Sequence, residues 1–229
     1  IVADICFYLL KKKRQAVEQN LRQIFRDTAD KKILRRHLRN TFRNYARCLI
    51  DVIRIPYISS KEIIKLVDFR GIENAAIALG MKRGLILVSL HIGNWDLAGC
   101  YLGALKLPLV AVAETTEPKM FDFYTKRREH TGIKTIPLNS SPFSFARVLK
   151  ENRVLGLIGD RDVTHSGIRT KFFNGWRMVP TGAERLAKAF KSPVSICYVV
   201  LNNNKPFRYL GMLEKPEIVK DRWSFTEKI

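Results

Sequence analysis

A histidine and an aspartate stand on either side of a glycine-containing turn near residue 90. His91 directly follows the apolar residues 84–90, and Asp96 comes five residues later, with Gly93 between them. Because glycine allows the chain to reverse tightly, we expect the two side chains to meet. A carboxylate that binds one imidazole nitrogen leaves the other free to take a proton, as a general base does when it activates a hydroxyl. A purely structural role also fits this spacing, with His91 as a cap and Asp96 opposing the helix dipole.

Other charged residues come after apolar runs that have the composition of buried strands. Glu114 follows residues 107–113, and Asp160, Arg161 and Asp162 follow residues 154–158 after a single glycine. Ligands of open α/β sheets bind outside the carboxyl ends of the strands, so these four side chains are candidates for substrate binding. Charges at such a point are costly unless they are solvated or used, which favours a functional interpretation.

Two arginines lie near the end of a predicted helix at residues 118–130. The guanidinium groups of Arg127 and Arg128 are suited to bidentate contacts with phosphate or carboxylate. A solvated basic helix end fits the same residues, so the sequence leaves both interpretations open.

From residue 66 onwards, apolar runs alternate with amphipathic stretches, which predicts an α/β fold with a mostly parallel sheet flanked by helices. Asn94 is a suitable N-cap for a helix that begins at Trp95. Residues 160–180 have no helical period and predict a long functional loop. Residues 202–204 predict a hairpin turn before an edge strand at 207–213. We expect the other strands at residues 84–90, 107–113, 154–158 and 194–200, and helices at 72–81, 95–105, 118–130, 142–150 and 181–190.

The N-terminal part of the chain is strongly basic. The protein has 229 residues and a net charge of +20, and residues 11–54 hold 14 Lys or Arg against four Asp or Glu. Apolar residues recur there at helical spacing and predict two amphipathic helices, at about 13–26 and 30–53, with a break at 28–30. The charge bias favours an anionic partner, namely nucleic acid, anionic lipid or an acidic carrier protein. We therefore divide the chain into a basic, membrane-proximal helical segment, 1–65, and an α/β core, 66–229.

The first ten residues are apolar and run directly into four basic residues at 11–14. Ten residues are too few to span a bilayer, for which about 20 are needed. Lysines directly after an apolar segment are typical of the cytoplasmic side of a membrane. This segment is therefore either the end of a truncated spanning or interfacial helix, or a short surface helix.

The overall composition narrows the class of protein further. Hydrophobic residues make up 46% and charged residues 27%, which is typical of a soluble globular domain and excludes wholesale disorder or a polytopic membrane protein. The GxSxG, P-loop, GxGxxG and HExxH patterns are missing. The four cysteines lack zinc-ligand spacing and are expected to be reduced thiols. From the missing patterns and this cysteine spacing, we expect neither a serine nucleophile nor a metal site.

Several of these segments together resemble a known family. Residues 91–99, HIGNWDLAG, resemble the HxGNW(E/D)xAG motif of bacterial lipid A biosynthesis acyltransferases and of mycobacterial phosphatidylinositol mannoside acyltransferases. Residues 37–40, HLRN, are similar to the family's HFRN stretch, and residues 159–182 are similar to its DxD…FFG…PxG region. The resemblance covers nearly the whole chain in the same order, and it implies a fold like that of glycerol-3-phosphate acyltransferase.

The resemblance assigns roles to the residues named above. It implies that His91 is the general base that deprotonates a sugar hydroxyl, with Asp96 as its acidic partner in an HxxxxD dyad. The hydroxyl would then attack the thioester carbonyl of an acyl donor, with no covalent acyl-enzyme. Arg128, with Arg127 beside it, would help to hold a phosphate. The substrate-binding residues implied in full are Gly93, Asn94, Trp95, Glu114, Arg127, Arg128, Asp160, Arg161 and Asp162.

The resemblance also implies the reaction partners. The acceptor is a lipid A precursor, a phosphatidylinositol mannoside or another membrane glycolipid, and Asp96 with residues 160–162 looks closer to the mannoside branch. The donor is an acyl carrier protein or acyl-CoA acting as co-substrate, and no resident cofactor is implied. We expect the protein at the cytoplasmic face of the bacterial inner membrane, bound peripherally or by one N-terminal anchor. Acyl-chain length would depend on an apolar pocket built from residues such as Trp95, Leu97, Tyr101 and Phe123.

Two other functions stay open at this point. The charge of +20 would suit a nucleic-acid-binding protein, although the sequence lacks an RNP-type motif, zinc fingers and a recognition helix, so nucleic acid is not the expected partner. The chain could also be an inactive, lipid-binding member of the family.

Overall fold

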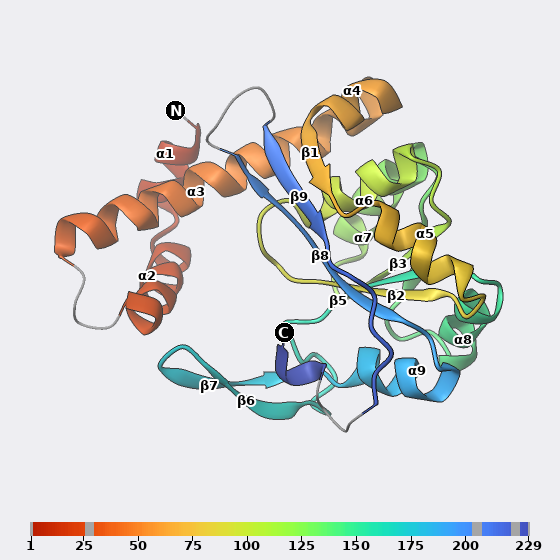
Figure 1. Cartoon of the computed structure of the whole chain (residues 1–229). Coiled ribbons are helices and arrows are strands. Elements are labelled where there is room, and N and C mark those ends of the chain that lie inside the picture. Colours follow the sequence, from red (N-terminus) through yellow and green to blue (C-terminus); the bar gives the residue numbers. More distant parts are fainter. Residues whose placement is uncertain (1, 26–29, 203–207, 221–224, 229) are drawn as a thin grey trace.

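A seven-stranded sheet forms the centre of the computed structural model, which describes residues 2–25, 30–202, 208–220 and 225–228 (Figure 1). The strand order is β1-β9-β8-β2-β5-β3-β4, and every neighbouring pair is parallel except β8 and β9. The predicted α/β fold with a mostly parallel sheet is confirmed. The strands are β1 Val67–Arg70, β2 Leu85–Ser89, β3 Leu109–Ala113, β4 Lys134–Pro137, β5 Val154–Ile158, β8 Val194–Leu201 and β9 Tyr209–Leu213.

Helices cover both faces of this sheet, because the strands in its middle are apolar on both sides. On β2, Leu85 and Leu87 point into one core cluster, whereas Ile86 and Val88 point into the other. The first cluster is covered by α4 Ser60–Lys65, α5 Glu73–Gly80, α6 Trp95–Ala104 and α7 Pro118–His130, and the second by α8 Pro142–Lys150 and α9 Gly182–Phe190 (Figure 1). The five helices predicted in this part of the chain are all present, within one or two residues.

The edges of the sheet differ from the prediction. The predicted edge strand corresponds to β9, but β9 lies between β8 and β1, so its edge position is wrong. The true edge strands, β1 and β4, are only four residues long and largely half-exposed, so they lack the apolar run that marks a buried strand. Residues 203–207, which include most of the predicted turn and the first predicted strand residue, lie outside the described residues.

The prediction of a loop for residues 160–180 is wrong in its second half. Strands β6 Ile168–Phe172 and β7 Gly175–Val179 pair there as an antiparallel ribbon outside the main sheet. Most of their residues are exposed or half-exposed, so the ribbon has no apolar face that a sequence pattern could indicate. At its tip, Asn174 Nδ2 donates a hydrogen bond of 2.8 Å to the carbonyl of Gln23 on α2.

In the described residues of the N-terminal part, 2–25 and 30–54, three helices form: α1 Val2–Leu9, α2 Lys11–Phe25 and α3 Lys31–Arg54. The two long helices match the predicted ones, and the predicted break lies mostly outside the described residues. Asp30 caps α3 by accepting a hydrogen bond from the Lys32 backbone N–H. None of the described helices is long and apolar enough to cross a bilayer.

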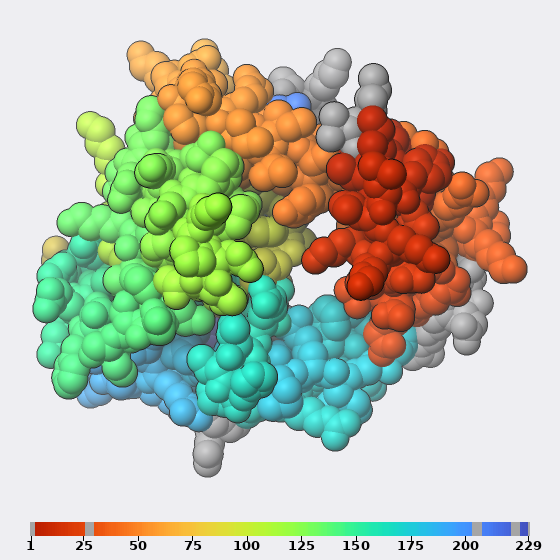
Figure 2. All heavy atoms as spheres, turned by 180° about the vertical axis from the view of Figure 1, so that it is seen from behind, coloured from red at the N-terminus to blue at the C-terminus, as the bar shows by residue number. Residues whose placement is uncertain are grey.

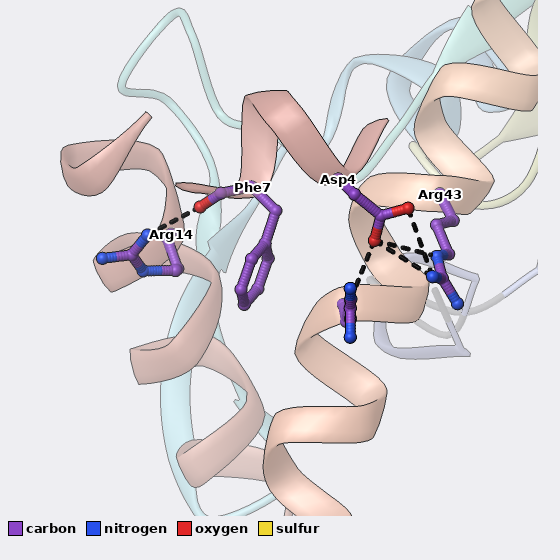
Figure 3. A network of polar contacts seen from close by, with 5 residues as sticks. Asp4, Phe7, Arg14 and Arg43 are labelled. Carbon is purple, nitrogen blue, oxygen red and sulfur yellow. Dashed lines mark hydrogen bonds and ion pairs between the residues drawn. The ribbon is translucent and has the colours of Figure 1, made fainter. Parts of the chain in front are cut away.

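Helix α1 packs against α3 through a carboxylate and an aromatic ring (Figure 3). Asp4 Oδ1 accepts hydrogen bonds from Arg39 Nε at 2.8 Å and Arg43 Nη2 at 3.0 Å. The hydrogen bond from Arg39 is the largest reason why the pKa of Asp4 lies below its ordinary value. Phe7 is buried and makes an edge contact with Phe42, with ring centroids 5.5 Å apart. The first residues therefore form a helix with one face docked on α3.

Candidate active site

A cavity of about 660 Å³ lies at the carboxyl ends of β2, β3 and β5. This is the edge at which open α/β sheets bind ligands. The interior is mainly apolar and includes Leu87, Leu102, Leu109, Ala111 and Leu157. Polar side chains also contribute to its wall, among them His91, Asp96, Glu114, Arg128, Arg161 and Arg185. On the rear side of the molecule, Figure 2 shows a hollow between the N-terminal helices and the α/β core.

His91 is hydrogen-bonded to Asp160, the residue that follows β5 and its glycine. The distance between His91 Nδ1 and Asp160 Oδ1 is 2.7 Å. Burial would raise the pKa of Asp160, but the hydrogen bond with His91 and the electrostatic attraction between the two side chains outweigh it, so the pKa lies below its ordinary value. An ionised carboxylate can only accept, so it fixes the hydrogen on Nδ1 and leaves the Nε2 lone pair available for a proton. The arrangement is that of an oriented general base.

The expected contact between His91 and Asp96 is not the one that the structure forms, which corrects that prediction. Asp96 Oδ1 accepts hydrogen bonds from Arg128 Nη2 at 2.7 Å and Nε at 3.0 Å. The two side chains are only 7% and 14% exposed, so each charge is compensated inside the protein. The physical reason is that α7 brings Arg128 to the start of α6, while the end of β5 brings Asp160 to the imidazole.

The other expected binding residues divide into two groups. Glu114 and Arg161 line the cavity and form an ion pair of 3.5 Å, with Arg161 largely exposed. Asp162 instead holds its own loop, because its Oδ2 accepts a hydrogen bond of 2.8 Å from the Gly167 N–H. Arg127 does not line the cavity; its guanidinium lies on the ring of Phe123, 3.3 Å from the centroid.

The turn that carries His91 is held by a buried network that sequence reasoning missed. Asn94 Oδ1 caps α6 by accepting from the Leu97 N–H at 3.1 Å, as predicted, and the Asn94 amide group donates to Tyr209 Oη at 3.3 Å. Tyr209 donates to Asp51 Oδ2 on α3 at 2.5 Å, and Arg208 Nη1 donates to Asp51 Oδ1 at 2.7 Å. These residues are scattered over 158 positions, so no spacing in the sequence marks them.

The turn also needs its glycine. Gly93 has φ of +61°, and a Cβ atom there would run into the carbonyl oxygen of Val199. The same close approach lets the Asn94 N–H donate to that carbonyl at 2.8 Å. The turn is therefore fastened to β8 as well as to α3, and His91 leaves it at a defined position.

The apolar wall of the cavity differs from the one expected. Trp95 lines it and packs edge-on against the His91 ring, with centroids 5.0 Å apart. Leu97, Tyr101 and Phe123 do not line the cavity; Leu97 and Tyr101 are buried in the core cluster, and Phe123 packs against that cluster. Helix α6 presents its small residues Ala98 and Gly99 to the cavity instead. We attribute the depth of the cavity to these small side chains.

The sequence profile described as bacterial lipid A biosynthesis acyltransferase matches residues 1–218. The chain belongs to this family. Among curated family relatives, the phosphatidylinositol mannoside acyltransferase of Mycolicibacterium smegmatis is 32% identical over 155 residues, which cover 66% of this chain and 51% of that protein. The protein of the same name from Mycobacterium tuberculosis is 30% identical over 151 residues, which cover 63% and 48%. The chain thus spans about half the length of these relatives, and the family resemblance seen in its motifs is confirmed.

Proposed function

We propose that the protein transfers an acyl chain from an acyl thioester to a hydroxyl group of a glycolipid. The observation that carries this proposal is His91 on the wall of an apolar cavity of about 660 Å³, with Asp160 hydrogen-bonded to its Nδ1. The pair supplies a general base for a hydroxyl, and the apolar interior offers room for a hydrocarbon chain. Membership of the acyltransferase family supports the same reaction.

In the proposed reaction, His91 Nε2 takes the proton of the acceptor hydroxyl as its oxygen bonds to the thioester carbon. The carbon–sulfur bond then breaks, and the imidazolium returns the proton to the leaving thiolate, so the products are an ester and a free thiol. Asp160 stabilises the imidazolium between these steps, because its negative charge lies 2.7 Å from Nδ1. No acyl group becomes attached to the protein.

Asp96 and Arg128 have a supporting part in this proposal. Arg128 Nε and Nη2 each donate one N–H to Asp96, so contact with a substrate phosphate falls to Nη1 and the second N–H of Nη2. The pair joins the start of α6 to the end of α7, and both residues line the cavity. We therefore assign to Asp96 the positioning of Arg128, and to His91 and Asp160 the movement of the proton.

We propose a mannose-containing or lipid A-type glycolipid as acceptor. The relatives are named phosphatidylinositol mannoside acyltransferases, which favours the mannoside. Glu114 and Arg161 lie on the cavity wall, where a carboxylate and a guanidinium can bind sugar hydroxyls and phosphate. The proposed donor is acyl carrier protein or acyl-CoA, because the basic surface suits an acidic carrier as well as a nucleotide.

We also propose that the protein works at the cytoplasmic face of the inner membrane. Exposed apolar residues on and just after α1, namely Tyr8, Leu9 and Leu10, precede the basic residues 11–14. The exposed aromatic residues Phe173 and Trp176 lie at and near the tip of the ribbon, which is bonded to α2. Apolar and aromatic side chains beside basic ones are typical of surfaces that bind anionic lipid.

A transfer assay tests the reaction. Palmitoyl-CoA and acyl-loaded carrier protein are supplied separately with a membrane glycolipid extract, and lipid masses are measured. We expect one added acyl mass that disappears in His91→Ala, because loss of a general base costs about 10²–10⁴-fold in rate. A wild-type rate in His91→Ala would contradict the mechanism, and no product with either donor would favour a lipid-binding protein without activity. Sedimentation with anionic and with neutral vesicles tests membrane binding, which should require the anionic lipid.

A further inference from the structure

The amino-terminal end of α9 lies at the same cavity as His91. This helix packs against β2 and β8 and leads directly into β8. Its start therefore lies at the carboxyl edge of the sheet, and residues Pro180, Thr181, Gly182 and Ala183 all line the cavity. The first N–H groups of a helix have no partner within the helix, and they form its positive end.

The hydroxyl of Thr181 is buried beside these N–H groups without a partner. Thr181 is 1% exposed, and its Oγ1 makes no hydrogen bond in the described part of the protein. It occupies the N-cap position of α9 but does not cap the helix, whereas Asn94 and Ser141 cap α6 and α8 with their side chains. A buried hydroxyl left unpaired costs stability, so its presence at a cavity points to a substrate atom that completes it.

Two further observations support the binding of a ligand oxygen here. Among the described residues, seven buried side-chain polar atoms lack a partner, and only Ser89 Oγ and Thr181 Oγ1 belong to residues of the cavity wall. At Gly182, a Cβ atom would meet nothing within 4 Å, and the backbone is outside the left-handed region. The fold therefore does not need a glycine at position 182. Because glycine has no side chain, the space beside the first N–H groups of α9 stays open.

We propose that the start of α9, with the Thr181 hydroxyl, is the oxyanion site of the acyl transfer. This inference rests on the proposed function. When the acceptor oxygen bonds to the thioester carbon, the electron pair of the C=O π bond moves to the carbonyl oxygen, which becomes negative. The Thr181 O–H and the N–H groups of the first turn donate to that oxygen, and the pair returns when the carbon–sulfur bond breaks.

The chemistry of the donors favours this oxygen over a phosphate group. The donors are uncharged N–H and O–H groups next to an apolar interior, and Thr181 is fully buried. A phosphate carries charge on several oxygens and would be expensive to bury without a cation beside it. Among the described residues of the first two turns of α9, Arg185 is the one cation that lines the cavity. Its side chain is exposed.

Three variants test the proposal. Thr181→Val keeps the shape and removes the hydroxyl, Thr181→Ser keeps the hydroxyl, and Thr135→Val removes another buried unpartnered hydroxyl that does not line the cavity. We expect Thr181→Val to lower kcat about 10²-fold or more with KM for both substrates within about 2-fold of wild type. Thr181→Ser should restore most of the rate, and Thr135→Val should behave as wild type. The Tm of Thr181→Val should be equal to or above that of wild type, because an unsatisfied group is removed.

The remaining outcomes each overturn the assignment. An unchanged kcat in Thr181→Val shows that the hydroxyl does not act in the reaction. A higher KM for the donor or the acceptor at unchanged kcat assigns the site to a substrate phosphate instead. A lower kcat with a lower Tm that Thr181→Ser does not restore indicates a structural role. If wild type shows no His91-dependent transfer, the proposed function fails and this inference fails with it, whereas normal wild-type transfer with an active Thr181→Val removes this inference alone.

Discussion

Replacing Asp160 by asparagine separates the geometry of the structure from the motif in the sequence. The motif pairs His91 with Asp96, whereas the structure bonds His91 Nδ1 to Asp160 at 2.7 Å and Asp96 to Arg128. Asparagine keeps the size of the side chain and removes its charge. Its amide group can also donate to Nδ1, which places the imidazole hydrogen on Nε2 and blocks the base. We therefore expect Asp160→Asn to lower kcat and to leave KM nearly unchanged.

The magnitude follows from the positions of the two charges. A carboxylate and an imidazolium whose charges are about 4 Å apart attract each other by about 4 kcal/mol at an effective dielectric constant near 20. The His91 side chain is 32% exposed, so solvent screening reduces this by about half. About 2 kcal/mol remains, which corresponds to a loss of about 30-fold in kcat. If the asparagine at position 160 also holds the hydrogen of His91 on Nε2, the loss of kcat would be larger, up to about 10⁴-fold in total.

Steady-state transfer kinetics of three proteins decide the question: wild type, Asp160→Asn and Asp96→Asn. The Asp96 variant is the matched control, because it leaves Arg128 buried without its partner and should lower the free energy of unfolding by about 3–5 kcal/mol. An Asp160 variant within about 3-fold of the wild-type kcat would refute the assignment of Asp160 as the partner of the base.

The pH dependence of stability gives an independent check on Asp160. Its pKa is lowered in the folded protein, so ionised Asp160 stabilises the fold above the pKa of the unfolded chain, about 3.9. That contribution is lost as the pH falls through the lower folded-state pKa. Urea unfolding from pH 7 to pH 2 should therefore show a smaller difference between wild type and Asp160→Asn at the acidic end than at pH 7. A constant difference would mean that the Asp160 pKa is not shifted by folding.

Three further predictions concern the support of the site. Gly93→Ala should lower the free energy of unfolding by about 2–4 kcal/mol in urea titrations, because the φ of +61° and the Val199 carbonyl both oppose a side chain at this position. An unchanged urea midpoint of unfolding would contradict the close contact between this turn and β8. Tyr209→Phe leaves buried Asp51 without its hydroxyl donor and should cost about 1–3 kcal/mol, with a lower kcat as a second readout. Cys100 and Cys197 should resist iodoacetamide at pH 8 in the folded protein, because burial raises the pKa of each thiol to about 12; mass spectrometry showing rapid modification would contradict their burial.

The central strands were predictable from the sequence, and the edges were not. Strands β2, β3, β5 and β8 lie inside the sheet with helices on both faces, so each appears as a largely apolar run. The edge strands β1 and β4 bury little and leave no such run, and the ribbon β6–β7 is exposed on both faces. The neighbours of β9 depend on β1, which is 142 positions away in the pairing of Val67 with Tyr209. A local pattern carries no information about such a partner.

The candidate site divides in the same way. His91, the capping role of Asn94 and the need for Gly93 could be inferred because all three act within one turn. The partner of His91 could not, because Asp160 is 69 positions away while Asp96 is only five. Sequence spacing favours Asp96 because it is the nearer carboxylate. Only the position of Arg128 on α7 shows that Asp96 is already hydrogen-bonded to another partner. The supporting residues Asp51 and Tyr209 are polar groups in otherwise apolar surroundings and carry no motif.

The position of β9 also determines when the site can form as the chain is made. Asn94 and its partner Tyr209 are 115 residues apart, and ribosomes add about 5–20 residues per second, so Tyr209 follows Asn94 by about 6–23 s. During this interval β1 has no strand beside it, and Asp51 is without its hydroxyl donor. A nascent chain thus carries its histidine and cavity-forming strands well before the turn is secured. Such long-range pairing closes slowly, so the synthesis of β9 sets the earliest moment at which the turn that carries His91 can be secured.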